Sequence, residues 1–174
     1  MKIHYDLHIH SCLSPCGDED MTPNNIVNMS CLMGLEMIAV ADHNTAANVR
    51  AVCKAAEGKL TVVPAIEITT AEEVHTLCYF PDIDSAEDMS NFLKKHMMGI
   101  KNKPEIFGRQ LIMDENDEIV GEETELLVSA VDLDIYKVQK AAAERGGIFV
   151  PAHINRSGYS LLAKSWFSAA RFAC

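Results

Sequence analysis

Two histidines near the N-terminus are spaced so that both could bind one metal ion. Residues 3–10 alternate between apolar and polar side chains, which is the period of a β-strand. Side chains two residues apart on a strand share a face, so His8 and His10 are predicted to point the same way, with Cα atoms ~7 Å apart. Imidazole is a common ligand of transition metals. The pair therefore predicts a metal site, with a merely polar strand face as the alternative.

Further candidate ligands lie at the ends of apolar runs along the chain. They are Asp42, His43, Glu67, His75 and His153. Imidazole and carboxylate donors together suit zinc, manganese or iron, and a carboxylate such as Glu67 can bridge two ions. Paired ions ~3.5–4 Å apart can activate water and bind a phosphoryl group. The donor set is therefore chemically suited to the hydrolysis of phosphate esters.

Alternating strands and helices are predicted to position these side chains. Strands are expected over residues 37–41, 60–66, 74–80 and 148–152. Helices are expected to begin at the caps Thr22, Thr45, Asp84 or Ser85, and Asp134. Continuous apolar strands that alternate with helices favour parallel βα units over an antiparallel sandwich. The candidate ligands lie just beyond the carboxyl ends of the later strands, where such folds place their sites.

Residues 99–126 interrupt the alternation and are predicted to be an insertion. Two short apolar runs, 111–113 and 119–120, flank the acidic run 114–118, which indicates a hairpin. The acidic run is not an EF-hand loop, because Ile119 stands where that loop requires glycine. Dense like charge is costly to bury, so an exposed turn remote from the metal ligands is expected.

Length and charge limit the class of protein. The 174 residues are enough for one domain with a hydrophobic core. No apolar run is long enough to span a bilayer, and the first residues do not resemble a signal peptide, so a cytoplasmic location is expected. The net charge of −10 argues against nonspecific binding to nucleic acid. It is compatible with an anionic substrate, because bound divalent ions reverse the local field.

The six cysteines form no Cys-x-x-Cys pair. Cys31, Cys53 and Cys78 lie in apolar stretches and are predicted to be buried thiols. Cys16 lies in the polar loop after the paired histidines, with Asp18 close behind. A thiolate ligand is chemically reasonable at this place, and a free loop thiol is the alternative.

Five motifs, taken in order, resemble the PHP (polymerase and histidinol phosphatase) family of metal-dependent phosphoesterases. They are DLHIHS at 6–11, ADHN at 41–44, AIEITT at 65–70, HTLCYF at 75–80 and PAH at 151–153. The first motif alone is weak, since amidohydrolases also begin with it. The resemblance implies a distorted (β/α)7-type barrel with two or three divalent ions (Zn, Mn or Fe). It also implies hydrolysis of a small phosphate ester or nucleotide by a metal-activated hydroxide.

The resemblance also implies a set of metal ligands. They are His8, His10, Cys16, His43, Glu67, His75 and His153. In the implied arrangement His8 and His10 hold the first ion, and Glu67 bridges it to a second. His75 and His153 would complete the second site. His43 would hold a third ion, which in this family often takes a further ligand from the loop where Cys16 stands.

The chain also departs from the family pattern. The closing Asp-x-His motif does not occur after His153, and the predicted strands are too few to close a seven-stranded barrel. We therefore expect residues 1–174 to form a single PHP domain that is truncated at its C-terminus. Its open strand edges would favour homo-oligomers. Arg156 could bind a substrate phosphate through two hydrogen bonds, with a surface arginine as the alternative.

Three functions are compatible with these residues. The first is a metal-dependent phosphoesterase acting on a small phosphorylated substrate, with Glu67 and Arg156 as its catalytic residues. The second is an amidohydrolase, which ranks lower because such enzymes usually carry a bridging lysine where this chain offers Glu67. The third is a metal-binding module with weak or no catalysis and a regulatory or structural role. The absent Asp-x-His predicts weaker turnover than in a chain that carries it, because poorly held ions are easily misplaced.

Overall fold

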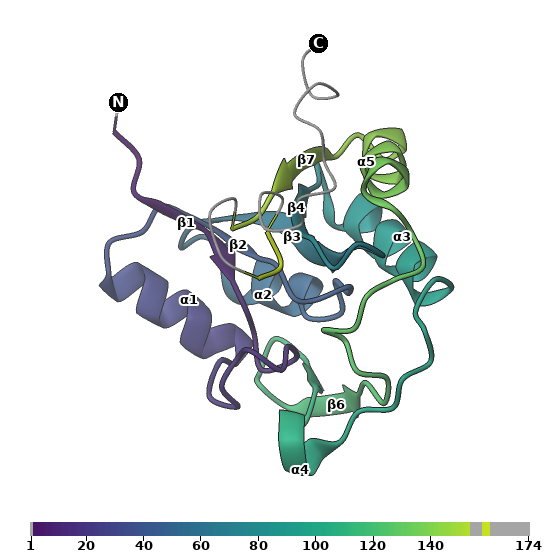
Figure 1. Cartoon of the computed structure of the whole chain (residues 1–174). Coiled ribbons are helices and arrows are strands. Elements are labelled where there is room, and N and C mark those ends of the chain that lie inside the picture. The colour runs from purple at the N-terminus through teal and green to yellow at the C-terminus, as the bar shows by residue number, and fades with distance from the viewer. Residues whose placement is uncertain (1, 154–157, 161–174) are drawn as a thin grey trace.

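A curled sheet of five strands forms the centre of the molecule (Figure 1). The computed structural model describes residues 2–153 and 158–160. The strand order is β1-β2-β3-β4-β7. These strands are β1 (Tyr5–Ile9), β2 (Met37–Val40), β3 (Thr61–Thr69), β4 (His75–Tyr79) and β7 (Ile148–Pro151). The α/β architecture expected from the alternating pattern is confirmed.

Four helices pack on the outer face of this sheet. They are α1 (Pro23–Leu32), α2 (Val49–Ala55), α3 (Ile83–Lys94) and α5 (Ile135–Glu144). The short α4 (Pro104–Phe107) lies in the insertion, beside β6 (Ile119–Glu122) (Figure 1). The predicted caps Thr22 and Asp134 are confirmed, each accepting a hydrogen bond from a backbone N–H three residues on. Such a cap contributes about 1 kcal/mol. The start of α3 was predicted two or three residues too late, because Asp82 is its cap.

The start of α2 differs more from the prediction. It begins at Val49 after Asn48, and not after Thr45. The side chain of Asn48 makes no capping hydrogen bond and instead bonds to other segments, described below. Tertiary contacts have therefore displaced the local capping preference.

The direction of β4 corrects the prediction of parallel units throughout. Strands β1, β2 and β3 are parallel, but β4 is antiparallel to both β3 and β7. Only the five residues 70–74 separate β3 from β4. A crossover to a parallel strand needs a dozen or more residues, so this short connection permits only a hairpin.

The two faces of the sheet differ in side-chain size. On the outer face, Ile38 and Val40 pack against α1 and α2, while Ile66 and Ile68 pack against α3 and α5. The inner face is lined by small side chains that alternate with these, including Ala39, Ala41, Ala65 and Ala152. Because strand side chains alternate between faces, Glu67 shares the inner face with Ala65. The small inner residues leave room there for larger polar groups.

The insertion forms the predicted hairpin, with β5 (Leu111–Met113) antiparallel to β6 (Ile119–Glu122). The turn between them is less exposed than predicted, because it packs against the start of α1. Asp117 accepts hydrogen bonds from the hydroxyl of Thr22 (2.8 Å) and the backbone N–H of Asn24 (2.9 Å). Unpaired N–H groups at a helix start attract a carboxylate. The hairpin is therefore docked on α1 and is not a free solvated turn.

Of the three cysteines predicted to be buried, one is confirmed, one is confirmed in part and one is wrong. Cys78 is buried, Cys53 is half-buried and Cys31 is exposed. The prediction for Cys31 is wrong because Ser30 takes the buried position on that face of α1. Within the described residues, no helix is long and apolar enough to cross a membrane.

Candidate metal centre

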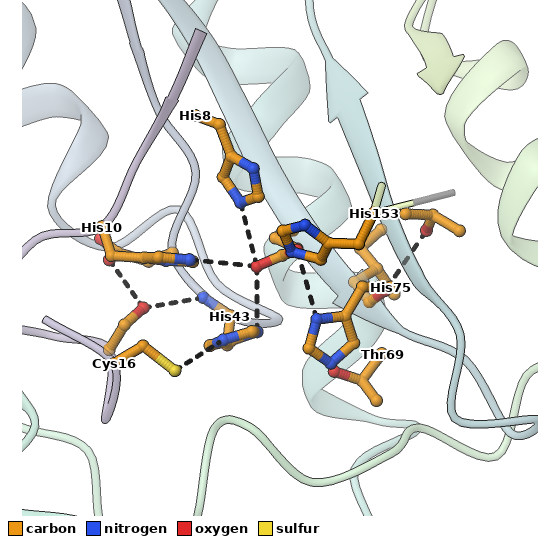
Figure 2. Close-up of polar contacts among 12 residues, drawn as sticks. His8, His10, Cys16, His43, Thr69, His75 and His153 are labelled. Atoms are coloured by element: carbon orange, nitrogen blue, oxygen red, sulfur yellow. Dashed lines mark hydrogen bonds and ion pairs between the residues drawn. The ribbon is translucent and has the colours of Figure 1, made fainter. Parts of the chain in front are cut away.

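A β-bulge in β1 orients the first two histidines. Asp6 pairs with Ile38 and Ile9 with Val40, so β1 holds one extra residue between these pairs. The backbone N–H of His8 donates to the carboxylate of Asp6 (3.1 Å), and the hydroxyl of Tyr79 donates to the carbonyl of Leu7 (3.0 Å). Bulges are frequent beside functional sites, where they redirect a side chain. Both His8 and His10 point to the inner face, as the alternation predicted (Figure 2).

The carboxylate of Glu67 lies within 3.5 Å of five imidazoles, which are the labelled histidines of Figure 2. Its side chain is 1% exposed. Nitrogen atoms of His8, His10 and His43 lie 3.2, 3.1 and 3.5 Å from Oε2. Nitrogen atoms of His75 and His153 both lie 3.3 Å from Oε1. The structure thus brings together six candidate ligands that the sequence distributes over residues 8–153.

The donors form two groups that share Glu67. One is His8, Glu67 and His153, and the other is His10, His43 and Glu67; within each group the ligand atoms lie within 4.8 Å of one another. This grouping differs from the arrangement implied by the family resemblance, in which His8 and His10 share an ion. A cavity of about 280 Å³ is lined by all six residues and Cys16.

The polar atoms of this cluster fit a bound cation. Among the described residues, neither oxygen of Glu67 has a hydrogen-bond partner of good geometry, and the same is true of His8 Nε2, His43 Nδ1 and His75 Nε2. Buried polar atoms are nearly always satisfied, so orphaned atoms in a native structure need an explanation. Zinc, manganese and iron each accept imidazole and carboxylate donors. The residues present therefore fit a divalent transition metal.

The protonation states also suit metal binding. Burial lowers the pKa of His43 to about 3, although the charge of Glu67 opposes this. Burial works against ionisation of Glu67, but contacts with His10 and His75 outweigh it and hold the pKa of Glu67 well below its usual range. Metal ligands must be neutral imidazoles and ionised carboxylates. His43 and Glu67 thus hold the required forms at neutral pH.

The loop after β1 brings Cys16 to the cluster. Its Sγ lies 3.5 Å from Nε2 of His43, on the side opposite Glu67 (Figure 2). Asp18 lines a neighbouring groove with His8 and His10 and belongs to neither donor group. Cys16 is therefore the better placed of the two candidate loop ligands. Arg156 lies outside the described residues.

Gly17 allows this loop to close. A Cβ atom on Gly17 would overlap the backbone carbonyl oxygen of Ser11, which cannot move without opening the loop. We expect Gly17→Ala to weaken metal binding and lower the free energy of unfolding by about 1–3 kcal/mol. Metal titration and urea unfolding measure the two effects. Gly121→Ala is the matched control, since its added methyl makes only ordinary contacts with Ile112; equal behaviour of the two variants would contradict the prediction.

The supporting roles of two residues were not predicted from the sequence. Tyr159 packs its ring against His75, with centroids 4.7 Å apart, and its carbonyl accepts the backbone N–H of His75 (3.0 Å). Asp42 was named as a candidate ligand, but it is completely buried and belongs to neither donor group. It accepts hydrogen bonds from the loop that carries Cys16. Neither role has a local sequence signal, because both depend on segments distant in the chain.

Comparison with known proteins gives matches only at the level of structure. No protein-family model matches the chain, and no curated protein matches its sequence. A protein from Bifidobacterium adolescentis described as a metal-dependent phosphoesterase is similar, with a TM-score of 0.64 and 20% identity over 90% of this chain and 69% of its own. Endonuclease Q from Pyrococcus furiosus, a lesion-specific endonuclease, has a TM-score of 0.72 and 20% identity over 98% of this chain.

The chain spans 39% of the length of that endonuclease. An amidohydrolase from Chromobacterium violaceum with bound sulfate is also similar, with a TM-score of 0.58 and 16% identity over 88% of this chain and 68% of its own. At these identities the likeness concerns the fold. The curled α/β half-barrel is therefore similar in fold to parts of these three structures, which confirms the α/β barrel-type fold expected from the sequence.

Proposed function

We propose that the chain is a metal-dependent phosphoesterase that hydrolyses a small phosphate ester or a nucleotide. The observation that carries this proposal is the buried carboxylate of Glu67, with five imidazoles within 3.5 Å of its oxygens. Two donor groups that share one carboxylate suit a pair of divalent ions. The similarity in fold to a protein described as a metal-dependent phosphoesterase supports the same activity.

In this proposal the candidate site residues divide into metal ligands and a group that binds the substrate. His8 and His153 would hold one ion with Glu67, and His10 and His43 would hold the other. His75 lies on the same oxygen of Glu67 as His153. We further propose Cys16 as a ligand of a third ion beside His43, and Arg156 as the group that binds the substrate phosphate. Because a neutral imidazole ligates through one nitrogen, His43 would hold either this third ion or the ion it shares with His10. Bound divalent ions would supply an activated water molecule and neutralise charge on the phosphoryl oxygens.

The donor set suits zinc, manganese or iron equally, so the metal is best identified by experiment. Elemental analysis of protein purified without chelators should find such an ion. The same protein, supplied with excess Zn²⁺ or Mn²⁺, should hydrolyse a generic aryl phosphate. Absence of metal would refute the proposal. Metal without turnover would favour the second candidate, a metal-binding module with a regulatory or structural role.

The partner we propose is a small phosphorylated molecule. Among the described strands, β1 and β7 lie at the two edges of the sheet. Open edges can pair with another chain, so we also propose these edges as the contacts of a homo-oligomer. Light scattering coupled to gel filtration tests that arrangement.

Metal binding should change the reactivity of one cysteine. Burial raises the pKa of Cys12 and Cys78 to about 12, so neither is expected to react with iodoacetamide at pH 8. Cys16 and Cys31 are exposed. We expect added Zn²⁺ to protect Cys16 and leave Cys31 reactive, as measured by peptide mass spectrometry. Equal labelling of Cys16 with and without Zn²⁺ would show that it is not a ligand.

A further inference from the structure

A buried network of hydrogen bonds begins at Asp42, directly before His43. Asp42 accepts from the backbone N–H of Ser11 (2.8 Å), from the hydroxyl of Ser11 (2.6 Å) and from the hydroxyl of Ser14 (2.8 Å). All three residues are at most 1% exposed. A hydroxyl has one proton to donate, and both serines direct it to Asp42. The serine oxygens are therefore left to accept hydrogen bonds from elsewhere.

The two serine oxygens accept from two different segments. The hydroxyl of Ser14 accepts a hydrogen bond from the backbone N–H of His43 (3.0 Å). The network therefore includes a candidate metal ligand. The hydroxyl of Ser11 accepts from the side-chain amide of Asn48 (3.0 Å). Ser11 and Ser14 thus hold the loop that carries Cys16 on the carboxylate of Asp42. Asn48 bonds to this loop through Ser11.

Asn48 connects this loop to the β5–β6 hairpin. Its amide N–H₂ also donates to the carbonyl of Leu111 (3.1 Å), and its amide oxygen accepts the backbone N–H of Met113 (3.0 Å). A direct backbone bond joins Leu111 to Cys12 (3.3 Å). Asn48 is completely buried, so it uses its side chain to join three segments and not to cap α2. A continuous path therefore runs from the hairpin to His43.

We propose that Asn48 is a positioning residue and that the β5–β6 hairpin, through it, holds the loop at 11–17 against the metal centre. The inference rests on the proposed metal site. Without Asn48, Ser11 loses the amide that links it to β5, and only the contacts of Cys12 with Leu111 still join the loop to β5. Cys16 then moves relative to His43, and the site on that side of Glu67 loses its geometry. The outer partners of metal ligands typically contribute ~10–100-fold to metal affinity.

The test compares Asn48→Ala with Gln110→Ala. Gln110 is also completely buried and makes three hydrogen bonds to or from its carboxamide, but its partners are Glu123 and Glu125 in the insertion and Leu127 directly after it. The amide of Asn48 makes a fourth contact, to Sγ of Cys12 (3.8 Å). Both variants therefore remove several buried side-chain hydrogen bonds, and they differ in whether these bonds reach the loop at 11–17. Ser11→Ala, which removes only the hydroxyl between Asp42 and Asn48, is a second, milder variant for use if Asn48→Ala does not fold.

Cobalt(II) titration of the full chain is the readout, since a thiolate–cobalt charge-transfer band reports Cys16 directly. We expect Asn48→Ala and Ser11→Ala to bind Co²⁺ about 10–100-fold more weakly and to lose the thiolate band, with an unchanged circular dichroism spectrum. Gln110→Ala should keep both affinity and band. Equal affinity and band intensity in all variants would overturn the inference while leaving the metal site in place. A wild-type chain that binds no Co²⁺ would instead overturn the proposed function.

Discussion

Glu67→Gln is expected to reduce the affinity for divalent metal by more than the ~10–100-fold typical of an outer partner. The replacement keeps the shape of the side chain and removes its charge. Both oxygens of Glu67 face imidazoles, three on Oε2 and two on Oε1. A glutamine presents one oxygen and one N–H₂ group, which cannot ligate, so one of the two donor groups loses its shared ligand. Turnover of an aryl phosphate should be lost together with the metal.

Isothermal titration with Zn²⁺ or Mn²⁺ and elemental analysis measure this effect. Glu57→Gln is the matched control, because Glu57 is an exposed glutamate outside both donor groups. It should bind metal as the wild type does. If Glu67→Gln retained wild-type affinity, the five imidazoles alone would hold the ions and the bridging role of the carboxylate would be wrong.

Metal-free protein is expected to lose stability as the pH falls from about 6.5 towards 3. The pKa of His43 falls from 6.5 to about 3 on folding because the ring is buried. Between these values the unfolded chain binds a proton that the folded chain does not, so acid favours unfolding, by an amount on the order of a few kcal/mol. Glu67 adds to the effect below about pH 4.5, because its pKa is also lowered on folding.

Two titratable neighbours, His10 and Asp42, oppose this loss of stability in acid. The pKa of His10 is raised, since Glu67 and Asp42 outweigh its burial, and burial raises the pKa of Asp42. Both groups favour the protonated folded state and reduce the net loss in acid. A substitution at His43 isolates its own contribution from theirs.

Urea unfolding in chelator at several pH values between 3.5 and 7.5 measures this dependence. His43→Asn should flatten the loss of stability below pH 6.5. His96→Asn is the control, because His96 lies outside the cluster and contacts Asp132 (2.6 Å). An unchanged pH slope in His43→Asn would mean that the buried ring does not resist protonation.

Local patterns were enough to predict several of the candidate ligands that the fold brings together. The alternation around His8 and His10 gave their shared face, and the apolar run before Glu67 marked the strand that delivers it. Both signals are local, because the apolar pattern of a short run of residues indicates a strand and its buried face. The hairpin in the insertion was predicted for the same reason.

The supporting contacts could not be predicted, because they join residues far apart in the chain. Asn48 bonds to Ser11 and to Met113, which are 37 and 65 positions away. From sequence alone, Asn48 is an ordinary polar residue at a helix start, and Asp42 is a candidate ligand because it lies beside His43. The reversal of β4 was missed for a different reason, since the apolar pattern of a strand does not give its direction.

Strand β3 has a bulky apolar outer face and an inner face of smaller residues that carries Glu67. This difference specifies the register of β3 against its neighbouring strands. A slip of one residue against β2 or β4 would turn Ile66 and Ile68 inward and Glu67 outward, against the apolar side chains of α3 and α5. An unpaired carboxylate buried among aliphatic groups is strongly unfavourable, so the misaligned state competes poorly. Correct folding and assembly of the donor cluster are therefore one event. The uptake of metal during refolding would then report how many molecules had reached the native sheet.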